Sequence, residues 1–203
     1  MPWSCRSVAC LLLATSLWLA VEAPPAQAQF WRRRNAPRVE QARIRVDVRR
    51  LAEAVHEQTN VERMRSRLQP LDRSPALASA AELHSRDMAE RGYFSHTTKG
   101  WVRGKSFSER LRAAGVSGRR LAENIALLPV RMAMLDAPDG ESLRVEPDYE
   151  GMAREVVQMW MKSAGHRRNI LDGHLDSLGV GCWLGEKSGV SYVYVTQDFG
   201  DLR

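Results

Sequence analysis

The chain has 203 residues, enough for one well-buried domain once its N-terminus is set aside. Its formal charge is +6, but residues 29–50 hold eight Arg against two acidic residues, a surplus of six, so the rest of the chain is close to neutral. A nucleic-acid-binding domain carries its own basic face. The neutral remainder argues against that function, and we expect no nucleic-acid partner.

The first 28 residues have the pattern of a secretory signal peptide. Arg6 supplies positive charge, residues 8–21 form an apolar run, and Ala26-Gln27-Ala28 is a small-x-small cleavage site. Cleavage between Ala28 and Gln29 predicts a secreted or periplasmic protein. The alternative is an uncleaved membrane anchor, but the run is shorter than the roughly 20 residues that span a bilayer. We therefore expect no transmembrane segment in the mature chain.

Residues 29–46 are predicted to be a basic, disordered leader that precedes a domain over residues 47–203. Contact of this leader with an anionic lipid or polymer is the alternative. Loss of the signal peptide leaves Cys182 without a cysteine partner, so no internal disulfide is expected. Its apolar, strand-like surroundings predict a buried and unreactive thiol.

The domain begins with two predicted helices. Residues 47–68 have apolar side chains at helical spacing. Ser74 and Pro75 have the residue types of an N-cap and first helical position, and Gly92 is suited to end the second helix. The following loop, residues 93–105, carries His96.

A mixed region follows. Residues 106–114 are predicted to form a short helix, and residues 121–128, apolar apart from Glu123 and Asn124, to form a buried extended segment or strand. The Pro, Gly and acidic residues of 130–150 predict a surface loop. A third main helix is expected over residues 151–162, and His166 comes just before a helical turn at residues 168–171.

The end of the chain predicts a β-hairpin. Residues 177–184 and 190–199 are rich in β-branched and aromatic side chains, and residues 185–189 join them as a turn. Helices first and an antiparallel hairpin last indicate an α+β fold, a small sheet covered by helices.

Several short motifs occur in order along this domain. They are Thr59-Asn60-x-x-Arg63, Leu71, His84 with Met88, Phe94-Ser95-His96, Glu123-Asn124-Ile125, Trp160-x-x-Ser163-x-Gly165-His166-x-x-Asn169-Ile170-Leu171, Gly179-x-Gly181 and Val195-Thr196-Gln197-Asp198-Phe199-Gly200. The series resembles the CAP superfamily of cysteine-rich secretory proteins, antigen 5 and plant pathogenesis-related proteins, and is most similar to the bacterial, disulfide-free branch with the SCP domain. The resemblance covers residues 51–200. It implies an α-β-α sandwich with a small antiparallel sheet flanked by helices.

The resemblance also implies a cleft that gathers two His and two Glu. By motif position His96 and His166 match the two histidines, and Glu123 matches the first glutamate. Ser163 occupies the position of the second glutamate, three residues after Trp160. This departure removes one carboxylate from the metal-binding set that the resemblance implies.

Considered without the family, two imidazoles and one carboxylate allow four interpretations. They suit zinc with a bound water, so a zinc-assisted hydrolase is possible with His96 and His166 as metal ligands. Metal-free acid–base catalysis by Glu123 or a histidine is the second interpretation. In the third, the histidines only satisfy a buried Glu123, which needs hydrogen bonds or a cation.

The fourth interpretation, binding without turnover, is our leading hypothesis. The cleft of His96, Glu123, Ser163 and His166 then holds a small ligand, a cation or a lipid-like molecule, or an envelope component, at the cell envelope or outside the cell. An extracellular hydrolase that uses His96, Glu123 and His166 is the alternative.

Ser163 and the other histidines receive plainer interpretations. The Ser163 hydroxyl is expected to bond to backbone at the end of its helix, and no G-x-S-x-G motif supports a nucleophile. His84 is expected to pack in the core, with a role in the cleft as the alternative. His56 and His174 are expected on the surface.

Overall fold

The computed structural model describes residues 46–99, 106–136, 143–187 and 189–203. The helices are α2 (Val48–Arg65), α3 (Pro75–Arg91), α4 (Phe107–Ala113), α5 (Tyr149–Lys162) and α6 (Ala164–Ile170). The strands are β1 (Asp72–Arg73), β2 (Leu121–Pro129), β3 (Met132–Asp136), β4 (Leu143–Pro147), β5 (Ser177–Lys187) and β6 (Val190–Gly200). The predicted signal peptide and, apart from Val46, the predicted leader lie outside the described residues.

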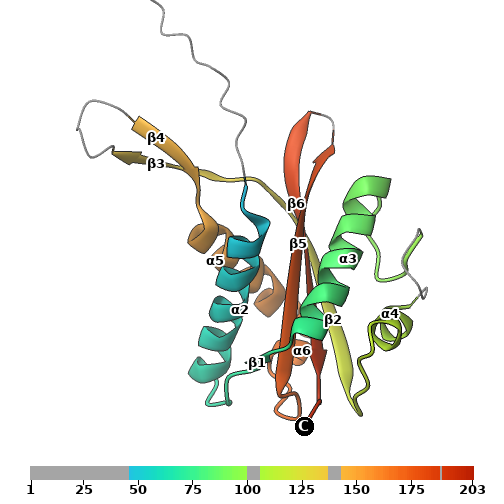
Figure 1. Cartoon of the computed structure of the whole chain (residues 1–203). Helices are drawn as coiled ribbons and strands as arrows, with labels where there is room; N and C mark the ends of the chain where they lie inside the picture. The colour runs from blue at the N-terminus through green and yellow to red at the C-terminus, as the bar shows by residue number, and fades with distance from the viewer. Residues whose placement is uncertain (1–45, 100–105, 137–142, 188) are drawn as a thin grey trace, which may run out of the picture. The chain divides into compact units, whose positions relative to one another are not determined.

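The main sheet has four strands in the order β1-β5-β6-β2 (Figure 1). β6 pairs antiparallel with β5 on one side and with β2 on the other. β1 adds only two residues, parallel to the start of β5. The expected small antiparallel sheet is therefore present, with one short parallel strand added. Its two long edges are β2 and the part of β5 beyond β1.

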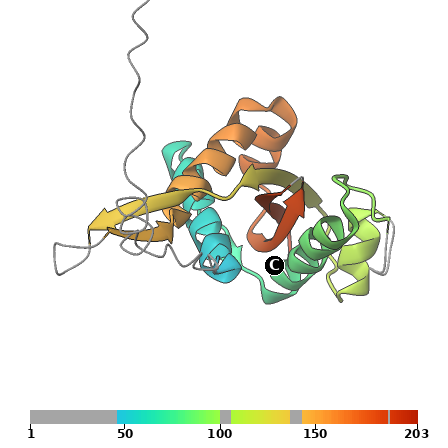
Figure 2. The ribbon, with the colours of Figure 1, turned by 90° about the horizontal axis from the view of Figure 1, so that it is seen from above.

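Helices cover both faces of this sheet. α3 and α4 lie on one face, while α2, α5 and α6 lie on the other (Figure 2). The largest apolar cluster joins α2 and α5 to the sheet and includes the fully buried Trp160 and Phe199. A smaller cluster under α3 and α4 contains Leu77 and Leu111. This arrangement is the predicted α+β sandwich.

Glycines in β5 let α3 approach the sheet closely. A Cβ on Gly179 would lie 2.0 Å from the backbone nitrogen of Ala78, and one on Gly181 would lie 2.0 Å from that of Glu82. Any side chain at these positions would collide with the backbone of α3. The close packing of α3 on β5 therefore explains why the Gly-x-Gly motif has glycine at both positions.

The helix ends follow the predicted chemistry. The Ser74 side chain accepts a hydrogen bond from the backbone N–H of Leu77, Pro75 is the first residue of α3, and Gly92 ends it at φ 65°. This left-handed conformation favours glycine. Ser106 begins α4 with a capping box to Glu109. α5 begins earlier than predicted, at Tyr149, because the Asp148 side chain caps it.

The predicted surface loop at residues 130–150 is wrong for the two ends of this range, while residues 137–142 lie outside the described residues. β3 pairs antiparallel with β4 and forms a separate hairpin that projects away from the main sheet (Figure 1). The Pro, Gly and acidic residues were typical of a loop, but ladder hydrogen bonds between two five-residue strands order the flanks of the segment. The predicted turn at residues 168–171 also belongs to a longer element, the seven-residue helix α6.

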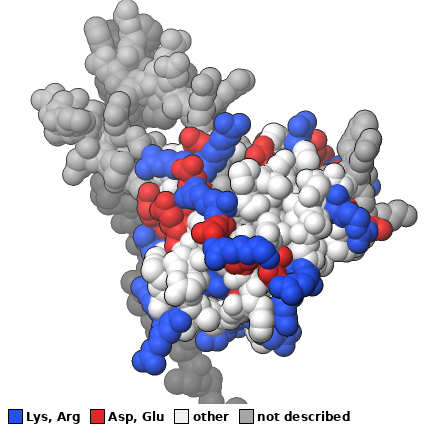
Figure 3. Space-filling model, turned by 60° about the horizontal axis from the view of Figure 1, so that its bottom comes forward, with Lys and Arg blue, Asp and Glu red and all other residues white. Residues whose placement is uncertain are grey.

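Charges of both signs are interspersed on the face that carries the C-terminal end (Figure 3). Three Arg–Asp pairs contribute to this pattern, namely Arg203 with Asp72, Arg119 with Asp201, and Arg120 with Asp172. Pairing of this kind leaves the face without a large area of one sign.

Candidate functional site

A buried carboxylate forms the centre of the site. Glu123 lies on β2, and its side chain is about 1% exposed. Its Oε1 accepts a hydrogen bond from Nδ1 of His96 at 2.8 Å, and its Oε2 accepts one from Nη2 of Arg110. Nε2 of His84 lies 4.0 Å from Oε2. Three basic side chains from three segments therefore surround one acid group.

Arg110 supplies the cation that a buried carboxylate requires. Arg110 is only 3% exposed. Its Nη1 also donates to the carbonyl of His96 at 2.8 Å and to the Thr98 hydroxyl at 3.2 Å. One guanidinium thus neutralises Glu123 and fixes the loop that carries His96. Arg110 was not among the residues predicted from the sequence. Two features of the sequence could have indicated it: a buried Glu123 needs a cation, and α4, which carries Arg110, follows His96 closely along the chain.

His84 is both a core residue and a neighbour of the carboxylate. It is fully buried on α3, and its Nε2 donates to the carbonyl of Ser95 at 3.0 Å. Burial and the charge of Arg110 lower the pKa of His84 to about 4, so its ring is neutral near pH 7. The expectation that it packs in the core is confirmed.

Two facing carboxyl groups take opposite protonation states. Burial by itself raises the pKa of Glu123, but the hydrogen bond from His96 and the charge of Arg110 outweigh it and lower the pKa. Asp198 faces Glu123 across β2 and β6 and is 1% exposed. Burial and the nearby charge of Glu123 raise the pKa of Asp198 well above its usual value. Glu123 is therefore ionised and Asp198 protonated. The presence of Asp198 beside the site was not predicted from the sequence.

The state of Glu123 fixes the tautomer of His96. An ionised carboxylate can only accept, so the proton on the His96 ring must lie on Nδ1. Whenever the ring is neutral, Nε2 carries a lone pair. The His96 side chain is 51% exposed, while its carboxylate partner is buried. The pair thus presents an oriented imidazole at the surface.

His166 comes to the β2 edge from α6. Its backbone carbonyl accepts a hydrogen bond from Asn124 at 3.3 Å, and Asn169, on the same helix, donates to the backbone carbonyl of Glu123 at 3.2 Å. The His166 side chain is partly buried. Burial lowers its pKa, and so does the positive charge that His96 carries when it is protonated. The charge states of the two imidazoles therefore affect each other. Of the two rings, only His96 makes a hydrogen bond to the Glu123 carboxylate in the described part of the chain.

Ser163 lies between the two helices of this layer. It ends α5 and begins α6, and its side chain makes no capping hydrogen bond at the start of α6. The expected bond from this hydroxyl to the helix end is therefore not present.

The remaining histidines and the cysteine are easily placed. His174 is exposed as expected, but His56 is only 7% exposed, because α2 packs it against β1 and β5. Its prediction as a surface residue is wrong. Cys182 is buried, and burial raises the pKa of its thiol, in agreement with an unreactive cysteine.

The residues of this site do not by themselves make up a zinc-binding set. In the part of the chain that the structure describes, no three His, Cys, Asp or Glu side chains are grouped to hold a metal ion. Both oxygens of Glu123 already accept hydrogen bonds from basic groups. Zinc binding by His96 and His166 stays a prediction.

The comparisons with known proteins agree with this fold. The protein YkwD of Bacillus subtilis is 32% identical over 127 residues, 63% of this chain and 40% of the relative's length. An extracellular protein of Bacillus anthracis that contains an SCP domain is 26% identical, with a TM-score of 0.52 over 73% of this chain and 39% of that one. An outer surface protein of Borrelia burgdorferi is 16% identical, with a TM-score of 0.53 over 78% of this chain and 97% of that one, and shares the fold.

Two further findings bear on the class of protein. None of the helices in the described residues has the length and apolar character needed to cross a bilayer. The model of the cysteine-rich secretory protein family, CAP, matches residues 56–199, which include every residue of the site. The chain belongs to the cysteine-rich secretory protein (CAP) family.

Proposed function

We propose that this chain is an exported CAP-domain protein that binds a small polar ligand between His96 and His166. The observation that carries the proposal is the hydrogen bond from the half-exposed His96 to the buried Glu123. It orients one ring so that, whenever this ring is neutral, Nε2 can accept a hydrogen bond from a hydroxyl or amide of the ligand. His166, whose pKa is lowered chiefly by burial, supplies a second imidazole.

Arg110 supports binding over catalysis. Its charge keeps Glu123 ionised and therefore keeps this carboxylate a weak base. A buried group held this firmly orients its neighbour, whereas a general base needs a pKa near the working pH. Export is supported by the signal-like N-terminus and by the related Bacillus anthracis protein, which is described as extracellular.

The hydrolase alternative rests on the same hydrogen bond. An imidazole whose Nδ1–H points to a carboxylate is also the arrangement of a general base. Binding and hydrolysis separate in a turnover assay with ester and amide substrates. Turnover that His96→Ala abolishes would favour the hydrolase.

The test of binding uses a library of small polar fragments and saturation-transfer NMR on the purified chain. We expect fragments that bind the wild type and lose binding in the double variant His96→Ala/His166→Ala. Ser191→Ala, on the exposed part of β6, is the control and is expected to bind as the wild type does. Equilibrium dialysis against Zn²⁺ tests the metal prediction separately. A library without any hit that depends on the two histidines would contradict the proposal.

A further inference from the structure

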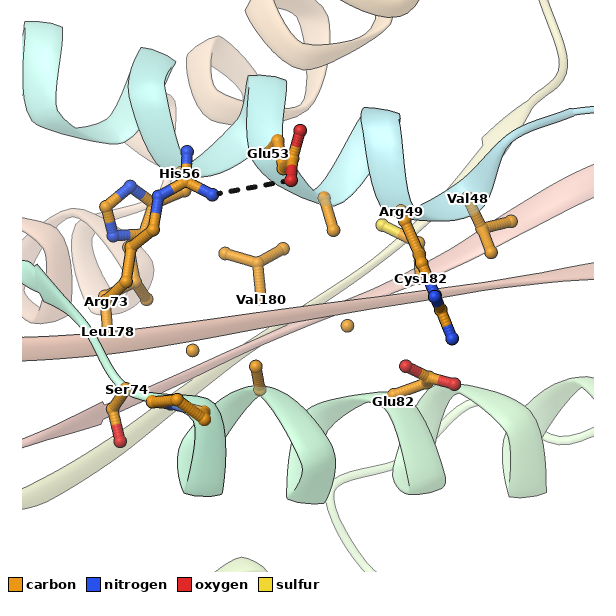
Figure 4. A pocket seen from close by; sticks show the side chains of 15 residues that line it. Val48, Arg49, Glu53, His56, Arg73, Ser74, Glu82, Leu178, Val180 and Cys182 are labelled. Carbon is orange, nitrogen blue, oxygen red and sulfur yellow. Dashed lines mark ion pairs between the residues drawn. The ribbon is translucent and has the colours of Figure 1, made fainter.

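The other long edge of the sheet borders a groove that the site above does not use. β1 covers β5 only at Ser177 and Leu178. Beyond them a cavity of about 390 Å³ lies along β5, between α2 and α3 (Figure 4). We name it the β5-edge groove. Its lining includes Val48, Ala52 and His56 of α2, Pro75 and Ala78 of α3, and Val180 of β5.

The backbone of β5 offers hydrogen-bonding groups to this groove. The carbonyl of Leu178 faces away from β6, since it accepts a hydrogen bond from the backbone N–H of Ser74 at 3.0 Å. Successive residues of a strand point their N–H and C=O groups to alternate sides. Because the β5–β6 register is regular throughout, Val180 and Cys182 point theirs the same way as Leu178. No strand among the described residues pairs with them there.

His56 adds a polar atom without a partner. His56 is 7% exposed, and its Nε2 makes no hydrogen bond with any described residue. Burial and the charge of Arg73 lower the pKa of His56 to about 4, so its ring is neutral near pH 7. A buried polar atom that lacks a partner costs stability. A bound hydroxyl or amide would supply that partner.

The charges at the rim balance each other. Arg73 pairs with Glu53 at 3.8 Å at one end, and Arg49 and Glu82 lie at the other end (Figure 4). A highly charged occupant would therefore gain little. The walls between these ends are small and apolar, with Ala52 and Ala78.

We propose that the β5-edge groove binds an extended, uncharged peptide segment of a partner protein, which adds a strand to β5 in line with β1. The proposal extends an interface that already exists, because β1 makes the same kind of pairing at the adjoining residues. An added strand binds through its main chain, which matches the row of N–H and C=O groups on the edge.

The walls specify the chemistry of the segment. The groove is lined by five consecutive residues of β5, of which Leu178 already pairs with β1, so about four peptide residues pair with the others. Side chains toward α3 must be small, since the backbone of α3 rests directly on the glycines of β5. Toward α2 there is room for Val or Thr beside Ala52, and a Thr hydroxyl can bond to His56. The expected pattern is Val or Thr alternating with Gly or Ser.

The test uses the full chain and the fluorescein-labelled peptide Val-Gly-Thr-Ser-Val with an amidated end. Fluorescence anisotropy is expected to show saturable binding. Two matched peptides carry N-methyl groups, one at Gly and Ser and the other at Thr and the last Val. Since only one set of amides faces β5, one peptide is expected to bind at least tenfold more weakly and the other within twofold. Absence of saturation, or an equal effect of both methylations, would overturn the proposal.

Matched protein variants locate the site. Ala78→Lys places a long side chain in the groove and is expected to weaken peptide binding at least tenfold. Ala76→Lys, an exposed position of the same helix, is expected to stay within twofold. The double variant His96→Ala/His166→Ala is also expected to bind the peptide normally, which separates this proposal from the one above. An unchanged affinity of Ala78→Lys would overturn it, and the methylated peptides keep the test independent of variant folding.

Hydrogen exchange of the peptide-free chain tests for other occupants. The amides of Val180 and Cys182 are expected to exchange quickly alone and at least tenfold more slowly with peptide. Slow exchange without peptide, at every protein concentration, would mean that the chain's own N-terminal segment fills the groove. Slow exchange only at high concentration would indicate a second copy. Either result overturns the proposal of a partner peptide.

Discussion

The two edges of the main sheet differ in how their backbone hydrogen-bonding groups are covered. At the β2 edge, side chains from the helices bond to the backbone: Trp160 Nε1 donates to the carbonyl of Ile125 at 3.0 Å, and Asn169 Nδ2 donates to that of Glu123 at 3.2 Å. At the β5 edge beyond Leu178, glycines bring α3 close and leave a groove. An exposed edge attracts further strands. The sequence therefore covers one edge with polar side chains and leaves the other accessible between two helices.

The ion pairs at these edges differ in the same way. Arg110 and Glu123 are each about 1% exposed, whereas the Arg73 and Glu53 side chains are 52% and 62% exposed. Breaking a buried pair leaves an uncompensated charge, while exposed pairs contribute little. An Arg–Glu ion pair thus contributes strongly to stability at the β2 edge and little at the β5 edge.

The largest expected effect comes from the buried pair. Glu123→Ala should lower the free energy of unfolding by about 3–5 kcal/mol, because it leaves Arg110 buried without a counter-charge. Urea denaturation measures this loss. The double variant Glu123→Leu/Arg110→Met is the control and should recover most of the stability. A loss below about 1 kcal/mol in Glu123→Ala would show that the pair is not buried.

Close packing at the other edge has the next largest effect. Gly181→Ala should cost about 3 kcal/mol, since its Cβ would lie 2.0 Å from a backbone atom of α3 that cannot move alone. Gly165→Ala, on α6 with no atom within 4 Å of the new Cβ, should be neutral or slightly stabilising. Thermal unfolding of both variants checks the contrast. Equal melting temperatures would contradict the close approach of α3 to β5.

The buried histidine at the site predicts a pH dependence. The folded state holds the pKa of His84 at about 4, below its ordinary 6.5, so the unfolded state binds a proton first as the pH falls. The contribution of His84 to stability is therefore complete above pH 6.5 and is lost toward pH 4. By about pH 4.5 the loss should be about 2 kcal/mol.

A variant isolates this term from the other titrating groups. His84→Gln retains a donor for the Ser95 carbonyl but does not titrate. Its unfolding free energy should fall less steeply than that of the wild type between about pH 6.5 and pH 4.5. Parallel curves would mean that His84 is accessible to protons in the folded state.

The exposed ion pair should have the smallest effect. Arg73→Gln removes the charge that faces Glu53 at the groove, and unfolding free energy should change by no more than about 0.5 kcal/mol. Urea denaturation at low and high salt measures it. A loss of about 2 kcal/mol or more would indicate that the β5 edge depends on this pair as the β2 edge depends on Arg110.

The sequence was sufficient to predict the sandwich, and the family resemblance implied that His96 and Glu123 share one cleft. Cap residues such as Ser74 and Gly92 act locally, and a polar pair inside an apolar strand indicates buried partners. Arg110 was missed because an arginine on a short amphipathic helix is usually exposed, and its burial depends on the loop that folds over it. The protonated Asp198 depends on the β2–β6 register, which no local pattern specifies.

Other errors have the same origin. His56 was assigned to the surface since its helix pattern allowed either face, and only the position of β1 decides its burial. The β3–β4 hairpin was missed because short strands with acidic residues resemble a loop until their pairing is known.

Long-range ¹⁵N–¹H NMR of the histidine rings provides the most direct test that an ionised, buried Glu123 orients His96. At a pH where His96 is neutral, its signals should show a proton on Nδ1 and a bare Nε2. In Glu123→Gln, whose amide can also donate, this preference should weaken. A ring with its proton on Nε2 in the wild type would show that Glu123 does not orient His96.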